Sequence, residues 1–279
     1  MPDDSTSLEP VRRAFARRMM EAAEWDEKRF EQAVLAVPRE AYLPAPPWLL
    51  IDPGLSQFHR STEAADLYRD VLVALDIAKG INNGQPTLHA AWIGKARPRA
   101  GETVVHVGAG MGYYTAILAA LVAPGGKVIA YEIEAALAEA AARNLAHLAH
   151  VEVKPADAVS DGVPEADIIY VNAGVVAPPL GWLEALKPGG RLVFPWRPRP
   201  DFGVALLVAR RGRGFDVEPF SPAFFIPCVG ASDDEIALRA PTRQDAAATR
   251  SLWLARDRPA DGTATAIYRD LWFSSEPAE

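Results

Sequence analysis

The residues most able to do chemistry lie in a glycine-rich turn. The segment Val104-Val-His-Val-Gly-Ala-Gly-Met-Gly-Tyr113 ends a short apolar run, and Glu132 closes the next one, Lys127–Tyr131. A strand that ends in such a turn presents backbone N–H groups and a helix N-terminus to a ligand, while an acid on the next strand accepts both ribose hydroxyls. The spacing therefore predicts a site for an adenosine-containing ligand.

The positions of the glycines narrow the class of ligand. Gly108, Gly110 and Gly112 form G-x-G-x-G, whereas a dinucleotide fingerprint has its third glycine at position 113, where this chain has Tyr113. With Tyr113 closing the turn, a pyrophosphate is less well accommodated than the shorter amino-acid tail of S-adenosylmethionine. The leading hypothesis is therefore an S-adenosylmethionine-dependent methyltransferase.

Composition excludes several other classes. The 279 residues carry a formal net charge of −7 with only 29 Lys and Arg, which disfavours a broad nucleic-acid-binding face. Cys228 is the single cysteine, so we expect no internal disulfide and no thiolate metal cluster, in keeping with a cytoplasmic protein. His59, His147 and His150 lack partners at metal-ligand spacing, so no metal is expected. The chain has no apolar run of about 18 residues, which predicts no membrane span.

The order of apolar runs predicts the fold class. Strands are expected near 103–107, 127–132, 151–154, 167–172 and 190–195, and helices near 113–122, 134–147 and 178–186. Short apolar runs that alternate with helical segments indicate an α/β fold with a mostly parallel, doubly wound sheet. Two further strands, Gly203–Arg210 and Phe215 to about Pro227, flank a turn sequence and should form an antiparallel hairpin at one edge.

We expect three regions along the chain. Residues 1–80 form an N-terminal part, which is helical at first and irregular over 43–62 because of its prolines. Residues 81–232 form the core. Residues 233–279 form a C-terminal appendage, which is expected to be a hairpin. The appendage is too rich in aromatic residues for a solvated tail. It should pack either on the core or on a second copy, so the chain is expected to be a monomer or a homodimer.

Several segments together resemble a known family. They lie in order between about residues 30 and 232, and they read Val37-Pro-Arg-Glu-Ala-Tyr-Leu-Pro44, Gly84-Gln85, Val104–Tyr113, Tyr131-Glu132, Ala156-Asp157, Pro178-Pro179, Gly189–Pro195 and Phe224-Phe-Ile-Pro-Cys-Val-Gly230. In this order they resemble the protein-L-isoaspartate O-methyltransferases. The resemblance implies a Rossmann-like sheet, S-adenosylmethionine as methyl donor and methyl esterification of a protein or peptide carboxylate.

The resemblance also implies a set of cofactor-binding residues. The glycine turn lies against the methionine portion, Glu132 holds the ribose, and Asp157 lies near the adenine amino group. With their chain neighbours, the implied residues are Gly108, Ala109, Gly110, Gly112, Tyr113, Glu132, Ile133, Asp157 and Ala158.

The acceptor side departs from the family pattern. The family carries G-Q-T-I-S-Q-P, whose serine hydroxyl orients the acceptor, and this chain has Gly84-Gln-Pro-Thr-Leu-His-Ala90. An ungapped alignment places Leu88 at the serine, and a shift by one offers Thr87 instead, although Thr87 is equally suited to capping a helix. Thr87 and His89 are the candidate catalytic residues.

Two polar residues near the glycine turn depart as well. His106 stands where the family carries Glu or Asp, a carboxylate that supports the turn and offsets the ammonium group of the cofactor. A neutral imidazole would support the turn and offset the ammonium charge only weakly. The alternative role for His106 is structural, as a strand-end histidine that forms hydrogen bonds with backbone groups. Asn172 follows the fourth strand without the Pro-Pro of nucleobase methyltransferases, so we expect a pocket-edge or turn residue.

Three functions remain open at this stage. The first is a methyltransferase for protein or peptide carboxylates; the second is a methyltransferase for another acceptor, such as a small metabolite or a modified peptide. The third is a non-catalytic cofactor-binding module. An ionised carboxylate acceptor needs no general base, because its reference pKa is about 4. A hydroxyl or amine acceptor would need one, and His89 is the first candidate.

Overall fold

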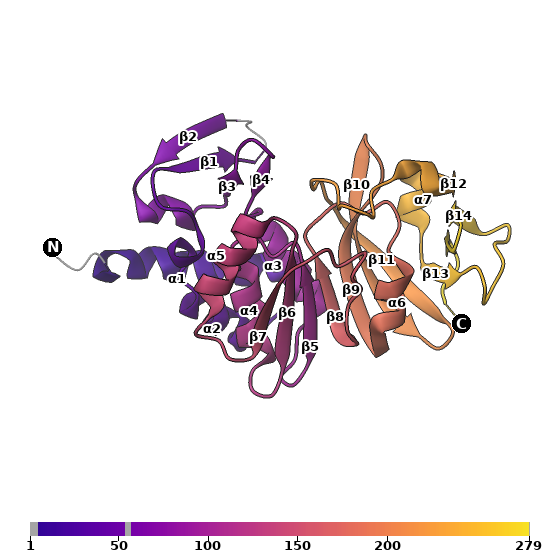
Figure 1. Cartoon of the computed structure of the whole chain (residues 1–279), viewed down its shortest axis with the longest axis horizontal. Coiled ribbons are helices and arrows are strands. Elements are labelled where there is room, and N and C mark those ends of the chain that lie inside the picture. Colours follow the sequence, from indigo (N-terminus) through magenta and orange to yellow (C-terminus); the bar gives the residue numbers. More distant parts are fainter. Residues whose placement is uncertain (1–4, 54–56, 279) are drawn as a thin grey trace. The chain divides into compact units, whose positions relative to one another are not determined.

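The structure, a computed structural model, describes residues 5–53 and 57–278. The chain forms two compact units (Figure 1). The first contains the chain up to Gly101 together with Ala109–Pro155, and the second contains Glu102–Gly108 and the chain from Ala156 onward.

The first unit combines helices with two sets of paired strands. Its elements are α1 Ser5–Ala23, α2 Lys28–Ala36, η1 Arg39–Tyr42, β1 Trp48–Asp52, β2 Gln57–Ser61, η2 Ala64–Tyr68, β3 Leu72–Asp76, β4 Ile81–Asn82, α3 Pro86–Ala96, α4 Tyr113–Val122, β6 Lys127–Glu132, α5 Ala135–Leu145 and β7 Val151–Pro155. Four short strands form an antiparallel sheet in the order β2-β1-β3-β4, and β6 pairs with β7 in parallel.

The expectation of an irregular segment over 43–62 is wrong for the half of it that forms β1 and β2. β1 and β2 pair there, with Leu50 opposite His59, while residues 54–56 of the segment lie outside the described part of the chain. The prolines precede β1 or follow it, so they bound the strand without interrupting it. Within β1, Trp48 and Leu50 are buried and alternate with less buried residues, which is the two-residue period of a strand.

The second unit is built on one continuous run of strands. Its elements are β5 Thr103–Val107, β8 Ala166–Val171, α6 Leu180–Ala185, β9 Leu186–Arg199, β10 Phe202–Arg211, β11 Gly214–Pro222, η3 Asp234–Ile236, β12 Ala237–Arg239, α7 Arg243–Ala248, β13 Ser251–Leu254, β14 Ala264–Tyr268 and β15 Leu271–Ser274. β5, β8 and β9 pair in parallel, and the antiparallel strands follow in the order β10-β11-β13-β15-β14-β12.

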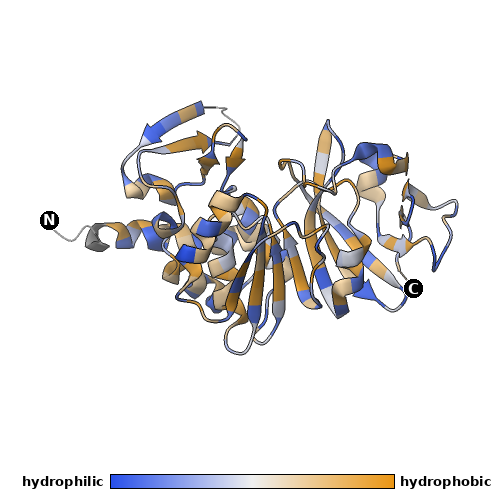
Figure 2. Ribbon diagram, in the orientation of Figure 1, coloured by the Kyte–Doolittle hydropathy of each residue, from blue (hydrophilic) through white to orange (hydrophobic). Residues whose placement is uncertain are grey.

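These elements confirm the α/β fold class and its parallel strands. All five residues of β5 are buried, as in a parallel strand that is covered on both faces. Figure 2 shows these parallel strands mainly in the hydrophobic colour. The expected helices near 113–122, 134–147 and 178–186 are α4, α5 and α6.

The antiparallel part is larger than the predicted hairpin. β10 and β11 pair as expected, but β11 is not the edge, because β13 pairs with it through Phe215 and Leu252. The two apolar runs on either side of residues 258–262 do not pair with each other. β15 lies between them, and β14 and β15 form the hairpin.

The aromatic residues of the C-terminal strands are buried within this unit. Trp272 and Phe273 are fully buried, and Phe273 stacks on Trp196 of β9 with 4.5 Å between ring centroids. The indole N–H of Trp272 donates to the carbonyl oxygen of Arg258 at 2.8 Å. The C-terminal strands therefore complete the apolar core of this unit.

Candidate functional site

The glycine turn belongs to the first unit from Ala109 onward. The Ala109 N–H donates to the carbonyl oxygen of Tyr131 at 3.1 Å, which ties the turn to β6. Gly112 then precedes α4 with a φ of 96°, and a Cβ on it would lie 2.7 Å from a methyl carbon of Leu145. Both the backbone conformation and the lack of space require glycine here.

Glu132 holds the turn as well as ending β6. Its Oε2 accepts the Gly110 N–H at 2.7 Å and its Oε1 accepts the Glu134 N–H at 3.0 Å. The carboxylate is 6% exposed, and burial raises its pKa above the ordinary value, while the two backbone N–H groups lower it. The two carboxylate oxygens have about four acceptor sites, so these backbone hydrogen bonds do not use all of them. The residue therefore still fits the ribose hydroxyls predicted for it.

Tyr113 and Ile133 differ in exposure. The Tyr113 ring is buried in the first unit and makes edge contacts with Tyr42 and Tyr114, and burial raises its pKa. Ile133 directly follows Glu132 and is 47% exposed, which is unusual for a large apolar residue at the end of a buried strand. Of the two side chains, only Ile133 offers an open apolar surface to a ligand.

The second unit contributes the start of the turn. Gly108 has a φ of 77°, and the Nδ2 group of Asn172 donates to its carbonyl oxygen at 3.3 Å. The same Nδ2 lies 2.7 Å from Nε2 of His106 on β5. Burial lowers the pKa of His106 to about 3, so this imidazole is neutral near pH 7. The prediction of Asn172 as a turn residue is consistent with these contacts.

Asp157 and Ala158 come soon after β7 in the sequence and belong to the second unit. Oδ1 of Asp157 accepts the Val159 N–H at 2.9 Å, and the buried Ala158 accepts the indole N–H of Trp182 at 3.0 Å. Burial, with a smaller contribution from Asp157, raises the pKa of Cys228 to about 12. The single cysteine is therefore a neutral thiol and no nucleophile.

Thr87 lies in the first turn of α3, but the expectation that it caps this helix is wrong. The cap position is Gln85, and Pro86 opens the helix. Gln85 makes no side-chain capping hydrogen bond, and Asp70 takes that role. The Asp70 carboxylate accepts the Thr87 N–H at 2.9 Å and the Thr87 hydroxyl at 2.7 Å. Because that hydroxyl donates to Asp70, it has no second proton to donate to an acceptor.

His89 is a core residue of the first unit. It is 1% exposed and stacks on Tyr114 at 3.8 Å between ring centroids. A Cβ on Gly84 would lie 2.1 Å from its Nε2, so the loop before α3 packs directly on this imidazole. A general base must reach the proton that it removes, and a ring packed in this way does not.

Three residues that shape the site were not predicted from the sequence. Asp70 holds Thr87 from 17 positions away, and the Asn144 side chain donates to the carbonyl oxygen of Met111 at 2.9 Å. Arg39 is fully buried and donates to the carbonyl oxygen of Val71 and, at 2.9 Å, to Oδ1 of Asn83. Only Arg39 had a sequence signal, its place in the Val37–Pro44 segment.

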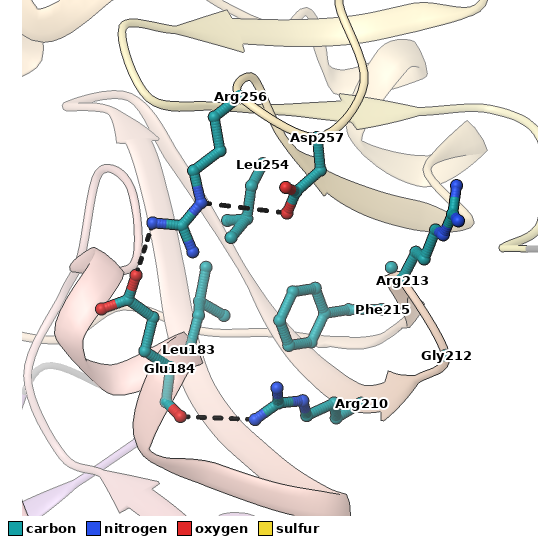
Figure 3. A pocket seen from close by; sticks show the side chains of 10 residues that line it. Leu183, Glu184, Arg210, Gly212, Arg213, Phe215, Leu254, Arg256 and Asp257 are labelled. Carbon is teal, nitrogen blue, oxygen red and sulfur yellow. Dashed lines mark hydrogen bonds and ion pairs between the residues drawn. The ribbon is translucent and has the colours of Figure 1, made fainter.

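A pocket of about 400 Å³ lies elsewhere in the second unit, at α6 and the β10–β11 turn (Figure 3). Arg256 pairs with Glu184 at 2.8 Å, and Arg210 donates to the Glu184 carbonyl oxygen at 3.3 Å. None of the lining residues is a predicted site residue. Beside this pocket a single ion pair, Arg256–Glu184, joins the C-terminal segment to α6.

Within residues 5–53 and 57–278, no helix combines the length and apolar character needed to cross a bilayer. In the same part of the chain, no group of three or more His, Cys, Asp or Glu side chains is arranged to hold a metal ion.

The glycine turn and the acid that ends β6 define a nucleoside-binding α/β protein of the methyltransferase type. Comparison with known proteins identifies the family. The profile described as protein-L-isoaspartate(D-aspartate) O-methyltransferase matches residues 55–233. A protein-L-isoaspartate O-methyltransferase from Methylorubrum extorquens is 36% identical over 209 residues, which cover 72% of this chain and 82% of the relative. A protein of the same name from Ignicoccus hospitalis is 29% identical, and the alignment covers 80% of this chain and 99% of the relative.

Solved structures show the same fold. A protein-L-isoaspartate O-methyltransferase aligns with a TM-score of 0.68 at 21% identity, over 94% of this chain and 86% of the other. A Plasmodium falciparum protein described as a protein-L-isoaspartate O-methyltransferase was solved with S-adenosyl-L-homocysteine. It aligns with a TM-score of 0.61 at 15% identity, over 78% of this chain and 97% of the other. The chain belongs to the protein-L-isoaspartate O-methyltransferase family. It is an S-adenosylmethionine-dependent methyltransferase, as the glycine turn predicted.

Proposed function

We propose that the chain methylates a carboxylate on a protein or peptide. The observation that carries the proposal is the family match over residues 55–233, which spans both the glycine turn and the acceptor segment. The relatives are named for isoaspartate as their acceptor. The acceptor of this chain is proposed as a carboxylate of the same kind or one derived from it.

The cofactor supplies an electrophilic sulfonium methyl group. In this proposal Gly108–Gly112 hold its methionine portion, Glu132 its ribose and Asp157 its adenine amino group. The exposed Ile133 offers the cofactor an apolar surface. The buried Glu132 carboxylate, which keeps acceptor capacity beyond its backbone hydrogen bonds, supports the ribose assignment.

A carboxylate acceptor needs only to be positioned. It is ionised at pH 7, because its reference pKa is about 4. Rate enhancement then comes from holding its oxygen about 3 to 3.5 Å from the methyl group in a site closed to water. The buried His89 is assigned a packing role, since no proton has to be removed.

A second candidate is a methyltransferase with a different acceptor. The Thr87 hydroxyl donates to Asp70, so it does not offer a carboxylate the hydrogen bond that the family serine offers. Asp70 also places a negative charge beside α3, which disfavours a second carboxylate there. These contacts favour an acceptor with N–H or cationic groups next to the methylated atom.

The experiment is incubation with radiolabelled S-adenosylmethionine and an isoaspartyl peptide, beside its normal aspartyl counterpart. Base-labile methyl ester on the isoaspartyl peptide alone supports the first proposal. Label on neither peptide, with cofactor binding intact, supports a different acceptor. If the label reaches no acceptor in a survey of carboxyl, hydroxyl and amine substrates, the chain is a cofactor-binding module.

A further inference from the structure

A buried acceptor lies beside the first glycine of the turn. Asn172 uses its Nδ2 group twice, at 2.7 Å to Nε2 of His106 and at 3.3 Å to the Gly108 carbonyl oxygen. Its Oδ1 is buried and accepts no hydrogen bond from any residue that the structure describes. All three residues belong to the second unit.

The Gly108 carbonyl oxygen fixes which way the Asn172 amide faces, because it can only accept a hydrogen bond. Because Nδ2 is a donor, Nε2 of His106 must carry the lone pair, and the ring proton sits on Nδ1. Exchanging the amide nitrogen and oxygen would set Oδ1 against the Gly108 carbonyl oxygen, and two acceptors repel each other. Oδ1 is therefore held on the side away from both partners.

A buried carbonyl oxygen without a hydrogen bond destabilises the folded protein, because it has lost its contact with water. In a folded protein such a group calls for a partner, which can be an ordered water or a ligand. The complement of Oδ1 is an N–H donor, and a cationic donor suits it best because charge-assisted hydrogen bonds are stronger. A carboxylate or phosphate oxygen does not fit, since it carries only lone pairs.

We propose that Oδ1 of Asn172 accepts a hydrogen bond from the α-ammonium group of S-adenosylmethionine, with His106 as the positioning residue that holds the amide. The inference rests on the proposed function, in which the glycine turn holds the amino-acid tail of the cofactor. A neutral amide thereby takes the task of the carboxylate that the family carries at position 106. Oδ1 is closed to solvent in this structure, so binding requires the groups that cover it to move aside.

The test is a double-mutant cycle between protein and ligand. Titration calorimetry compares S-adenosylhomocysteine with its analogue in which hydrogen replaces the α-amino group, on the wild type and on Asn172→Ala. Removing the amine should weaken binding to the wild type at least tenfold, equivalent to about 1.4 kcal/mol. In Asn172→Ala the two ligands should bind within about threefold of each other, because the shared hydrogen bond is already lost.

The matched control is Asn144→Ala, which removes another side-chain amide that supports the turn, at the Met111 carbonyl oxygen. It should weaken both ligands by the same factor and keep the tenfold difference. An equal loss of both ligands in Asn172→Ala would show that Asn172 only supports the turn, and the proposal would be overturned. If Asn172→Ala does not fold, the wild type decides: a loss of less than twofold on removing the amine overturns the proposal. Failure of the wild type to bind S-adenosylhomocysteine at all would instead refute the proposed function.

Discussion

Replacing His106 by Gln should remove an acid-sensitive part of the stability of this protein. Burial lowers the pKa of His106 from 6.5 to about 3 in the folded state. A group whose folded pKa is depressed contributes stability above its unfolded pKa and loses it as the pH falls toward the folded value. The affected window therefore lies between about pH 7 and pH 3.

The magnitude follows from the two pKa values. At pH 8 the imidazole is neutral in both states, and at pH 5 it is almost fully protonated in the unfolded chain only. The wild type should then lose about 2 kcal/mol of unfolding free energy from this group between pH 8 and pH 5. The figure is almost unchanged for any folded pKa below about 4, because the unfolded pKa of 6.5 sets it.

The assay is urea unfolding of the cofactor-free protein at pH 8 and pH 5, followed by tryptophan fluorescence. In His106→Gln the amide oxygen still accepts from Asn172, so the pH-dependent loss should be about 2 kcal/mol smaller than in the wild type. The control is the same exchange at the exposed His147, which should leave the wild-type difference in place. Equal acid sensitivity of the wild type and His106→Gln, or an imidazole signal of His106 that titrates near pH 6.5, would refute this account.

Four further outcomes are expected. Glu132→Ala should bind S-adenosylhomocysteine at least tenfold more weakly by calorimetry, since a hydrogen bond to a charged group contributes about 1.5–3 kcal/mol; unchanged affinity would remove the ribose assignment. Methylation of a standard isoaspartyl peptide should be weak in the wild type and stronger in Leu88→Ser, and wild-type turnover equal to that of an authentic repair enzyme would contradict our interpretation of the acceptor segment. Trp272→Ala should lower the unfolding free energy by about 3–5 kcal/mol in a chemical melt, the usual cost of emptying a buried tryptophan site. Truncation after Ala231 should lower the melting temperature of an otherwise unchanged monomer. Loss of a dimer on truncation would show instead that the aromatic strands form an interface.

Local sequence patterns were sufficient to predict the strands and the helix that carry the glycine turn. β5, α4 and β6 follow from two apolar runs and three closely spaced glycines, because a strand, its turn and the following helix are contiguous in sequence. The small antiparallel sheet of the first unit was missed, since the prolines around β1 outweighed the alternation of Trp48 and Leu50.

Side-chain partners far apart in sequence could not be predicted. Asp70 reaches Thr87 from a loop with no distinctive pattern, and His106 meets Asn172 across 66 positions. The parallel register of β5 and β8, which sets His106 beside Tyr170, brings the two strand ends together. A hydrogen bond between them depends on rotamers and burial, which the sequence does not report.

The pairing of β13 with β11 has a consequence for how this chain avoids self-association. A protein that ended where the family match ends, at residue 233, would leave Phe215 and Asp216 at the start of β11 without the partner strand that β13 supplies, and so open to pairing with another molecule. In the full chain the antiparallel strands end instead in β12, which is only three residues long and carries Arg239. Short, charged edge strands are poor templates for pairing, so the C-terminal segment protects this protein against aggregation.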